Sequence, residues 1–229
     1  PYQQEAVDAF CSGSDGLLGG KGLLRLPTRS GKTVIAAGVI DRLGVNTLFM
    51  VQSEMLLAHT IHLFKTVLQV PIGKIGAGSW DVEDITVASC QTLTRRAGNQ
   101  EVVDLLERSD LVIFDECHHL EGKRWRQLLE SVDAMFKLGL SATIYFDLDG
   151  ETPKGSIWMK AATGQVLYSM EPSELIRMGY LIKPVINLIP VRGEIIADDY
   201  PAAYQAGIVE HAERNAMVCE EVFKATADG

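Results

Sequence analysis

Short apolar runs alternate with helix-spaced apolar positions along the first half of the chain. The run at residues 22–26 leads into a turn-rich segment and then into apolar positions between 34 and 43, a pattern typical of a strand, a loop and a buried helix. The β-branched and aromatic run at 47–51 precedes residues 57–68, where apolar side chains recur every three or four positions on one helical face. Strand and helix therefore alternate twice within this segment.

The same alternation continues further along the chain. Strands are expected at 85–88, 111–114 and 136–140, with helices between them at 102–106 and 125–132. Strands that are apolar throughout and alternate with helices indicate a parallel sheet with both faces covered. The sequence therefore predicts an α/β fold with a mainly parallel sheet covered by helices on both faces, complete between Gly22 and Leu140.

The character of the chain changes after Ser141. Residues 145–164 are rich in Gly, Asp, Lys and Thr and predict an irregular excursion, followed by a short helix at 173–178 that Gly179 closes. Residues 180–191 look extended, and 203–225 look helical. We place the edge of the first domain near residue 192. The sequence starts at Pro1 without an initial Met, and residues 225–229 follow a helix-like stretch without a closing strand, so we expect that both ends are cut.

Composition and charge narrow the function classes. With 229 residues, 47% of them hydrophobic, the chain can bury one sizeable core. Neither a membrane span nor a secretory leader is supported, and four scattered cysteines without a CxxC pair fit reduced thiols in an intracellular or cytoplasmic protein. A net charge of −9 excludes a global positive field, so any nucleic acid must be held by a local face.

The segment PTRSGKT at residues 27–33 lies between a strand and a helix, where backbone N–H groups can surround a polyphosphate. Lys32 would reach the β and γ phosphates of ATP, and the Thr33 hydroxyl would ligate Mg²⁺. Leu26 stands where the usual phosphate-loop pattern has its first glycine, and a plain surface turn is the alternative interpretation. The predicted nucleotide-binding residues of this segment are Thr28, Arg29, Ser30, Gly31, Lys32 and Thr33.

Two acidic residues, Asp115 and Glu116, follow the apolar run 111–114. A carboxylate at the tip of a core strand suits Mg²⁺, so Asp115 is the expected metal ligand. Glu116 would orient and deprotonate the attacking water. An acidic helix cap is the alternative for either residue alone, but together with the phosphate-loop segment, on successive strand ends, the pair favours ATP hydrolysis.

Four motifs occur in a fixed order along the chain. They are Pro1-Tyr2-Gln3, PTRSGKT, Asp115-Glu116-Cys117-His118 and Ser141-Ala142-Thr143. In this order they resemble the first RecA-like domain of superfamily 2 helicases and translocases, in particular the branch with restriction-enzyme motor subunits and the excision-repair helicase. The resemblance implies a RecA-like P-loop NTPase fold at 1–191, and a linker with the start of a second RecA-like domain at 192–229.

The resemblance also assigns roles to individual residues. Gln3 would read the adenine edge, since a carboxamide both donates and accepts hydrogen bonds; a polar residue in a first helical turn is its alternative. Ser141 and Thr143 would couple the nucleotide site to nucleic acid, and His118 would bond across to them. The predicted catalytic residues are Lys32, Asp115, Glu116 and His118.

Further polar residues follow the strands at 47–51 and 85–88. By the same resemblance they would contact the backbone of a nucleic acid, expected to be DNA, with little sequence specificity. These residues are Gln52, Ser53, Gln91, Thr92 and Arg95. For Arg95 and the adjacent Arg96, a solvated helix start is an equal alternative.

Two features of the motifs need separate interpretation. Arg29 stands where relatives most often have glycine, so either the loop keeps φ negative there or nucleotide affinity is lowered. Cys117, His118 and His119 suggest zinc, but adjacent residues seldom converge on one ion. We therefore expect His119 to be structural.

The sequence thus predicts the ATP-driven motor domain of a DNA helicase or translocase, incomplete without a second RecA-like domain that supplies arginine fingers. A P-loop phosphotransferase or nucleotide switch is an alternative, which a water-activating Glu116 disfavours. A non-catalytic nucleic-acid-binding module is another, but the fold alone does not require Lys32 or Asp115.

Overall fold

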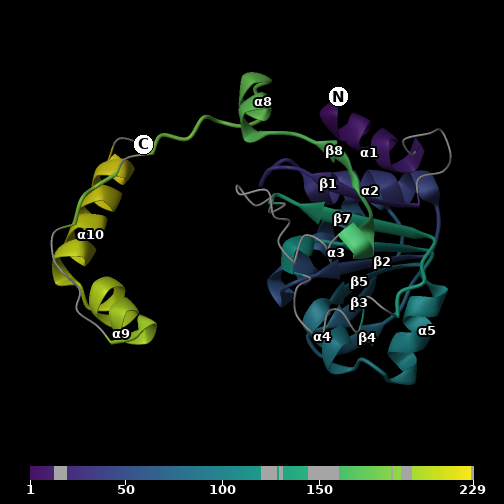
Figure 1. The fold of residues 1–229 in the computed structure, drawn as a ribbon. Helices are drawn as coiled ribbons and strands as arrows, with labels where there is room; N and C mark the ends of the chain where they lie inside the picture. Colours follow the sequence, from purple (N-terminus) through teal and green to yellow (C-terminus); the bar gives the residue numbers. More distant parts are fainter. Residues whose placement is uncertain are drawn as a thin grey trace. The chain divides into compact units, whose positions relative to one another are not determined.

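The computed structural model describes residues 1–12, 20–119, 128, 131–143, 160–186, 188–191 and 198–227 (Figure 1). The chain divides into two compact units, Pro1–Ile182 and Lys183–Gly229. This division falls about ten residues before the domain edge expected from the sequence, so the segment leaving the first unit begins earlier than the change of composition suggested.

The first unit contains one mixed, mostly parallel sheet. Its strands are β1 (Lys21–Arg25), β2 (Thr47–Val51), β3 (Gly73–Gly76), β4 (Ser79–Asp81), β5 (Ile85–Ser89), β6 (Leu111–Phe114), β7 (Phe136–Ser141) and β8 (Val166–Ser169). The eight described strands lie in the order β4-β3-β5-β2-β6-β7-β1-β8. All neighbours are parallel except β3 and β4, which form an antiparallel hairpin.

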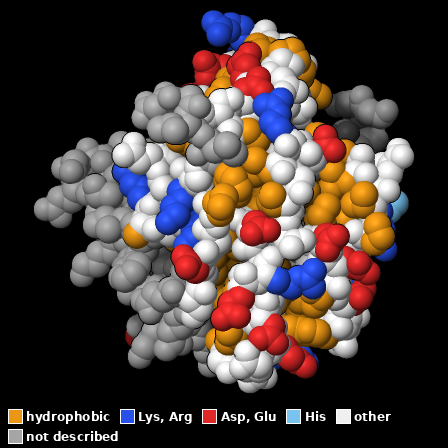
Figure 2. All heavy atoms as spheres, turned by 90° about the vertical axis from the view of Figure 1, so that its right-hand side faces the viewer, with side chains coloured by type: hydrophobic (Ala, Val, Ile, Leu, Met, Phe, Trp, Pro, Cys, Tyr) orange, Lys and Arg blue, Asp and Glu red, His pale blue; other side chains and the backbone are white. Residues whose placement is uncertain are grey.

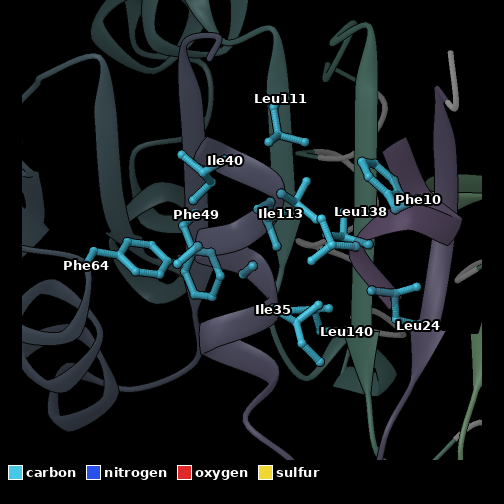
Figure 3. Packing of buried hydrophobic residues seen from close by; sticks show 14 of the residues in the cluster. Phe10, Leu24, Ile35, Ile40, Phe49, Phe64, Leu111, Ile113, Leu138 and Leu140 are labelled. Carbon is cyan, nitrogen blue, oxygen red and sulfur yellow. The ribbon is translucent and has the colours of Figure 1, made fainter. Parts of the chain in front are cut away.

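Helices cover both faces of this sheet, as predicted. They are α1 (Tyr2–Ser12), α2 (Lys32–Leu43), α3 (Glu54–Leu68), α4 (Cys90–Arg95) and α5 (Gln100–Arg108), with a 3-10 turn at Cys117–His119; the short helix α8 (Pro172–Arg177) follows β8. Strand β2 shows why both faces are needed, because all five of its residues are buried. Phe49 belongs to the apolar cluster that includes α1, α2 and α3, and its ring lies 5.1 Å from that of Phe64 (Figure 3). Leu48 and Met50 belong to the other cluster, with α4 and α5.

Two features of the first unit differ from the prediction, and two predicted segments lie mostly outside the described residues. The sheet is not complete at Leu140, because β8 pairs in parallel with β1 and forms the edge strand. The β3–β4 hairpin was not predicted, because its strands are short and Gly73 lies so close to Asp81 and Glu83 that no side chain fits there. Most of the predicted segments 125–132 and 145–164 lie outside the described residues.

The second unit is helical. The expected single helix at 203–225 is instead α9 (Tyr200–Tyr204), a π-helical turn (Gln205–Val209) and α10 (Ala212–Ala227). Side chains of α10 explain the break, because Asn215 Nδ2 donates to the carbonyl of Val209 at 2.9 Å and Arg214 Nη1 donates to that of Ile208 at 3.3 Å. These carbonyls would otherwise lack partners at a helix end. The described part of 180–191 contains no strand.

The described surface agrees with the acidic composition. On the face formed by the right-hand side of Figure 1, acidic and basic side chains are interspersed with hydrophobic ones, and the described residues form no continuous basic surface there (Figure 2). Among the described residues, no helix has both the length and the apolar character needed to cross a membrane.

Candidate functional site

The loop between β1 and α2 is built to present backbone N–H groups. Leu26 N donates to the carbonyl of Ser141 in β7 at 2.9 Å, which fixes the start of the loop on the neighbouring strand. The chain then forms a turn, which is closed by a hydrogen bond from Ser30 N to the carbonyl of Pro27 at 3.2 Å. Gly31 follows with a left-handed φ of 79°, and α2 begins at Lys32. The first N–H groups of a helix lack intrahelical acceptors, so they face an anion placed at this end.

Helix α1 holds this loop from one side. Tyr2 OH donates to the carbonyl of Ser30 at 2.6 Å, and Gln3 Nε2 donates to the same oxygen at 3.2 Å. A Cβ atom at Gly31 would lie 2.4 Å from Gln3 Nε2, so both the backbone dihedral and the Gln3 side chain require glycine there. Ser30 Oγ is buried and has no hydrogen-bond partner among the described residues, as expected of a group that serves a ligand.

Arg29 adopts a φ of 66°, so the possibility that this loop position keeps φ negative is wrong. The left-handed region is the conformation that glycine adopts freely and that costs other residues about 1 kcal/mol or more. The loop therefore has a backbone shape that glycine would adopt without strain, and the arginine side chain adds strain to that shape.

The end of β6 supplies the two acidic residues. Asp115 N donates to the carbonyl of Met50 in β2 at 3.1 Å, and Glu116 N donates to Asp115 Oδ1 at 3.1 Å. Glu116 itself has a φ of 48°, so the chain turns sharply here and brings its side chain toward the loop of β1. Burial raises the pKa of Asp115 to about 6, the charge of Glu116 adds to this, and Lys32 opposes it.

A continuous chain of polar contacts joins three of the predicted motifs. Lys32 Nζ lies 3.1 Å from Glu116 Oε1, and His118 Nδ1 lies 3.3 Å from Glu116 Oε2. The same His118 nitrogen lies 3.1 Å from Ser141 Oγ, which is the contact across to β7 that the sequence predicted. Ser141 Oγ in turn donates to the carbonyl of Thr143 at 2.8 Å and accepts from Thr143 N at 3.2 Å.

His118 Nδ1 is placed to donate to both of its neighbours. The hydroxyl of Ser141 donates to the carbonyl of Thr143, and an ionised Glu116 offers only acceptors. A proton on Nδ1 therefore satisfies both contacts. The phosphate loop and the acidic pair were expected on successive strand ends, but their strands β1 and β6 are not neighbours, because β7 with Ser141 lies between them.

Few side chains are available as metal ligands, and they offer hard oxygen donors. Thr33 lies in the first turn of α2 and Asp115 follows β6, and a hydroxyl with a carboxylate suits Mg²⁺ completed by phosphate oxygens and water. The described residues contain no group of three or more His, Cys, Asp or Glu side chains that could hold a metal. Burial raises the pKa of the Cys117 thiol far above its ordinary range, so without a metal this residue remains a neutral thiol.

The residues predicted to contact nucleic acid form two groups at the ends of β2 and β5. Ser53 caps α3, with its Oγ accepting from Leu56 N at 3.3 Å. The Nε2 of the preceding Gln52 is buried and has no partner among the described residues. Arg95 Nε donates to the carbonyl of Gln91 at 3.1 Å.

A surface cavity of about 440 Å³ lies beside the second of these groups. It is lined by Glu54, Ala77, Gly78, Thr92, Arg95 and Arg96. Ala77 and Gly78 form the tip of the β3–β4 hairpin, both with positive φ. Arg96 is engaged within the chain, since its guanidinium lies 5.0 Å from the Trp80 ring and 3.2 Å from Glu101. Arg95 is thus the more available cation in this cavity.

Sequence reasoning missed two contributors to these sites. Tyr2 was recognised only as part of the first motif, and no role was predicted for its side chain. Its position next to Gln3 was the signal that it also reaches the phosphate loop. The tip of the hairpin was missed because its two strands were not predicted. Ala77 did not indicate a turn either, because alanine rarely adopts a positive φ.

Comparison with known proteins adds to this geometry. The family described as "Type III restriction enzyme, res subunit" matches residues 1–146. The DNA 3'-5' translocase XPB2 of Sulfurisphaera tokodaii is 31% identical over 142 residues, which cover 62% of this chain and 30% of that protein. The putative DNA 3'-5' helicase Rad25 of Halobacterium salinarum is 29% identical over 221 residues, covering 89% of this chain and 32% of that protein.

A solved structure shares the fold. The helicase domain of Hef from Pyrococcus furiosus superposes with a TM-score of 0.60 at 23% identity, covering 77% of this chain and 39% of that one. The first unit therefore has the RecA-like fold. The chain spans about a third of the length of the curated relatives, 30% and 32% for the two named above.

Proposed function

Because this chain belongs to the type III restriction enzyme res subunit family, as an N-terminal RecA-like domain of superfamily 2, we propose that it is the ATP-hydrolysing half of a DNA helicase or translocase motor. The observation that carries the proposal is the chain of contacts from Lys32 through Glu116 and His118 to Ser141. Phosphate-loop, acidic and coupling motifs meet there at the ends of three strands, an arrangement that a binding module does not need.

The nucleotide would be held by this chain's own donors. The N–H groups at the start of α2 and the Ser30 hydroxyl face the phosphates, Lys32 neutralises the terminal phosphate charge, and Gln3 reads the base. Mg²⁺, held by Thr33 and Asp115, would supply charge stabilisation of the transferred phosphoryl group. Glu116 would accept the proton of the attacking water.

The Lys32–Glu116 ion pair would be affected by nucleotide binding. A terminal phosphate competes with Glu116 for the Lys32 ammonium, because both are anions within reach of the same group. Nucleotide binding would therefore release Glu116 from Lys32 and leave it available as a base. His118 remains beside Glu116 and would hold the carboxylate in place through its Nδ1 proton.

DNA is proposed as the polymer that stimulates hydrolysis. XPB2 and Rad25 are both named as acting on DNA, and Gln52, Ser53, Thr92 and Arg95 lie where strands β2 and β5 end. Their contacts would be to phosphates, which gives positioning with little sequence readout. The Ser141 carbonyl, bonded to Leu26 N at the start of the phosphate loop, would link this surface to the nucleotide.

A second RecA-like domain would complete the site and supply arginine fingers, in a protein that works inside the cell. The matched segments make up only 30% and 32% of the two relatives, which are therefore much longer than this chain. We propose that residues 1–191 form the first motor domain and 192–229 the linker and start of the second. Helix α10 fits this role, because Val218, Val222 and Phe223 are exposed on it, as expected of a helix that packs against further chain.

The test is phosphate release by a polypeptide that carries this chain and the following motor domain. ATP turnover should rise with added single- or double-stranded DNA and should fall to background in Lys32→Ala. Turnover indifferent to any nucleic acid, with phosphate transferred to a small acceptor, would establish a phosphotransferase instead. Binding of DNA with no ATP turnover in the unmodified protein would leave only a binding module.

A further inference from the structure

The carbonyl of Ser30 in the phosphate loop accepts two side-chain hydrogen bonds. Ser30 lies between two residues with left-handed backbone, Arg29 at φ 66° and Gly31 at φ 79°. Tyr2 OH donates to this oxygen at 2.6 Å and Gln3 Nε2 donates at 3.2 Å. A peptide group between two left-handed residues has few stabilising local contacts, so these two side-chain bonds keep the loop in its curved form.

Tyr2 is suited to this role by its surroundings. Only 5% of the residue is exposed, and burial raises the pKa of its phenol further above neutrality. The hydroxyl therefore stays protonated and remains a donor across the physiological range. A buried phenol whose hydroxyl reaches a strained loop differs from an ordinary core aromatic, which needs only to bury its ring.

The ring of Tyr2 is contacted by a residue far along the chain. Tyr180 lies with its ring centroid 4.9 Å from that of Tyr2 at an interplanar angle of 67°, an edge-to-face pair. Tyr180 is about half exposed, and it is placed two residues before the first unit ends at Ile182. The aromatic pair therefore joins the phosphate-loop support to the segment that leads toward the second unit.

A helix end sets the position of Tyr180. Helix α8 is anchored by the fully buried Leu175, whose carbonyl accepts from Tyr180 N at 2.9 Å. Gly179 N donates to the carbonyl of Ile176 at 3.0 Å, and Gly179 has φ 79°. These two bonds form a Schellman motif, the closure in which a left-handed glycine directs the following residue back over the helix.

We infer that Tyr2 is a positioning residue for the phosphate loop, and that Tyr180 makes this positioning depend on the segment that leaves the first unit. The inference rests on the proposed function, because the loop acts on ATP only in that case. The consequence is a mechanical link: a movement of the following chain that displaces Tyr180 loosens Tyr2, and the Ser30 peptide then loses one of its two supports.

The chain offers a matched control. Tyr168 OH donates to Glu5 Oε2 at 2.9 Å, so this phenol also makes a hydrogen bond that involves α1. Its hydroxyl bond goes to an exposed carboxylate and not to the loop. Tyr168→Phe therefore removes a hydrogen bond from the same helix and measures the general effect of such a loss, whereas Tyr2→Phe and Tyr180→Ala test the link itself.

The first measurement is amide hydrogen exchange of the 229-residue chain over residues 27–33. Loss of a neutral hydrogen bond or of an aromatic pair changes an opening equilibrium by a factor of about 2 to 13. Exchange in this peptide should accelerate by that factor in Tyr2→Phe and in Tyr180→Ala, and stay unchanged in Tyr168→Phe. Unchanged exchange in Tyr2→Phe, or equal acceleration in the Tyr168→Phe control, would overturn the inference.

The second measurement is the dissociation constant of a fluorescent ATP analogue with Mg²⁺ for the same proteins. It should rise by about 2- to 13-fold in Tyr2→Phe, while Tyr180→Ala should add little to Tyr2→Phe if both act through one support. Additive effects would overturn the dependence on Tyr180, and unchanged affinity with faster exchange would overturn the positioning role. If the unmodified chain bound no nucleotide at all, the proposed function would fail, and exchange alone would decide whether Tyr2 holds the loop.

Discussion

Lys32 Nζ and Glu116 Oε1 lie 3.1 Å apart, so the phosphate-binding cation and the proposed catalytic base neutralise each other directly. Lys32 is largely buried, and its charge would be costly without a partner. The pair also means that each residue alters the other when it is replaced. Variants at these two positions should therefore differ in kind as well as in degree.

Lys32→Ala should abolish nucleotide binding, whereas Glu116→Gln should keep it and lose turnover. The first change removes the phosphate-neutralising cation. The second frees Lys32 from its ion pair and removes only the base, so ATP affinity should equal or exceed the parental value while kcat falls by about 10²–10⁴. Equilibrium nucleotide binding and single-turnover phosphate release distinguish the two. Parental turnover in Glu116→Gln would show that another group activates the water.

Gly31→Ala should damage the loop more than an alanine at another left-handed glycine. At Gly31 the new Cβ would meet both a φ of 79° and Gln3 Nε2 at 2.4 Å. Gly44→Ala is the control, because its φ is 60° and no atom lies within 4 Å of the new Cβ. We expect about 1 kcal/mol of lost stability at Gly44 and a greater loss at Gly31, together with loss of nucleotide binding. Equal unfolding free energies for the two variants would contradict the packing of Gln3 on Gly31.

Arg29→Gly should be tolerated or improve the protein. The native residue has φ 66°, so glycine removes left-handed strain of about 1 kcal/mol, partly offset by the greater freedom of glycine in the unfolded chain. ATP affinity should be equal or better, because Lys32 and Mg²⁺ already neutralise the phosphates. Chemical denaturation and nucleotide titration test both points. A fall in turnover of more than about tenfold, or 1.4 kcal/mol, would assign Arg29 a catalytic role.

The core of the fold was predictable because burial on both sides leaves a strong signal. Strands β2 and β6 begin and end at the predicted residues, since every side chain in them is apolar or buried. Strands β3 and β8 gave no such signal. The first contains two glycines in four residues, and the second has only three apolar residues, which are partly buried at the edge of the sheet, so neither shows a long hydrophobic run.

The candidate site was predictable as a set of motifs but not as a network. Sequence order indicated that Lys32 and Glu116 lie at strand ends, yet it carried no information that they pair, because their contact depends on the sharp turn at Glu116. The left-handed backbone of Arg29 was equally hidden. A non-glycine residue rarely adopts that conformation, so propensity favoured the opposite choice.

The pKa of Asp115 predicts a pH-dependent stability. In the folded chain this pKa is about 6 against 3.8 for the free residue, so the folded state holds an extra proton between these values. The protonated form contributes stability that is present below pH 3.8 and is lost as pH rises through 6. Asp115→Asn should therefore stabilise the metal-free chain at pH 7 more than at pH 4. Urea unfolding at both pH values tests this, and a pH-independent difference would contradict the shifted pKa.

The last prediction concerns the 229-residue chain by itself. It should fold, bind Mg-ATP weakly and show almost no DNA-stimulated turnover, because the described sheet and its two apolar clusters belong to the first unit while the proposed arginine fingers do not. An arginine finger contributes a factor of about 10³–10⁵ to turnover in P-loop enzymes, so the chain should be slower than a two-domain polypeptide by roughly that amount. Steady-state phosphate release, with and without DNA, compares the two proteins. Strong DNA-stimulated turnover by the 229-residue chain would show that the finger comes from within it or from a second copy of it.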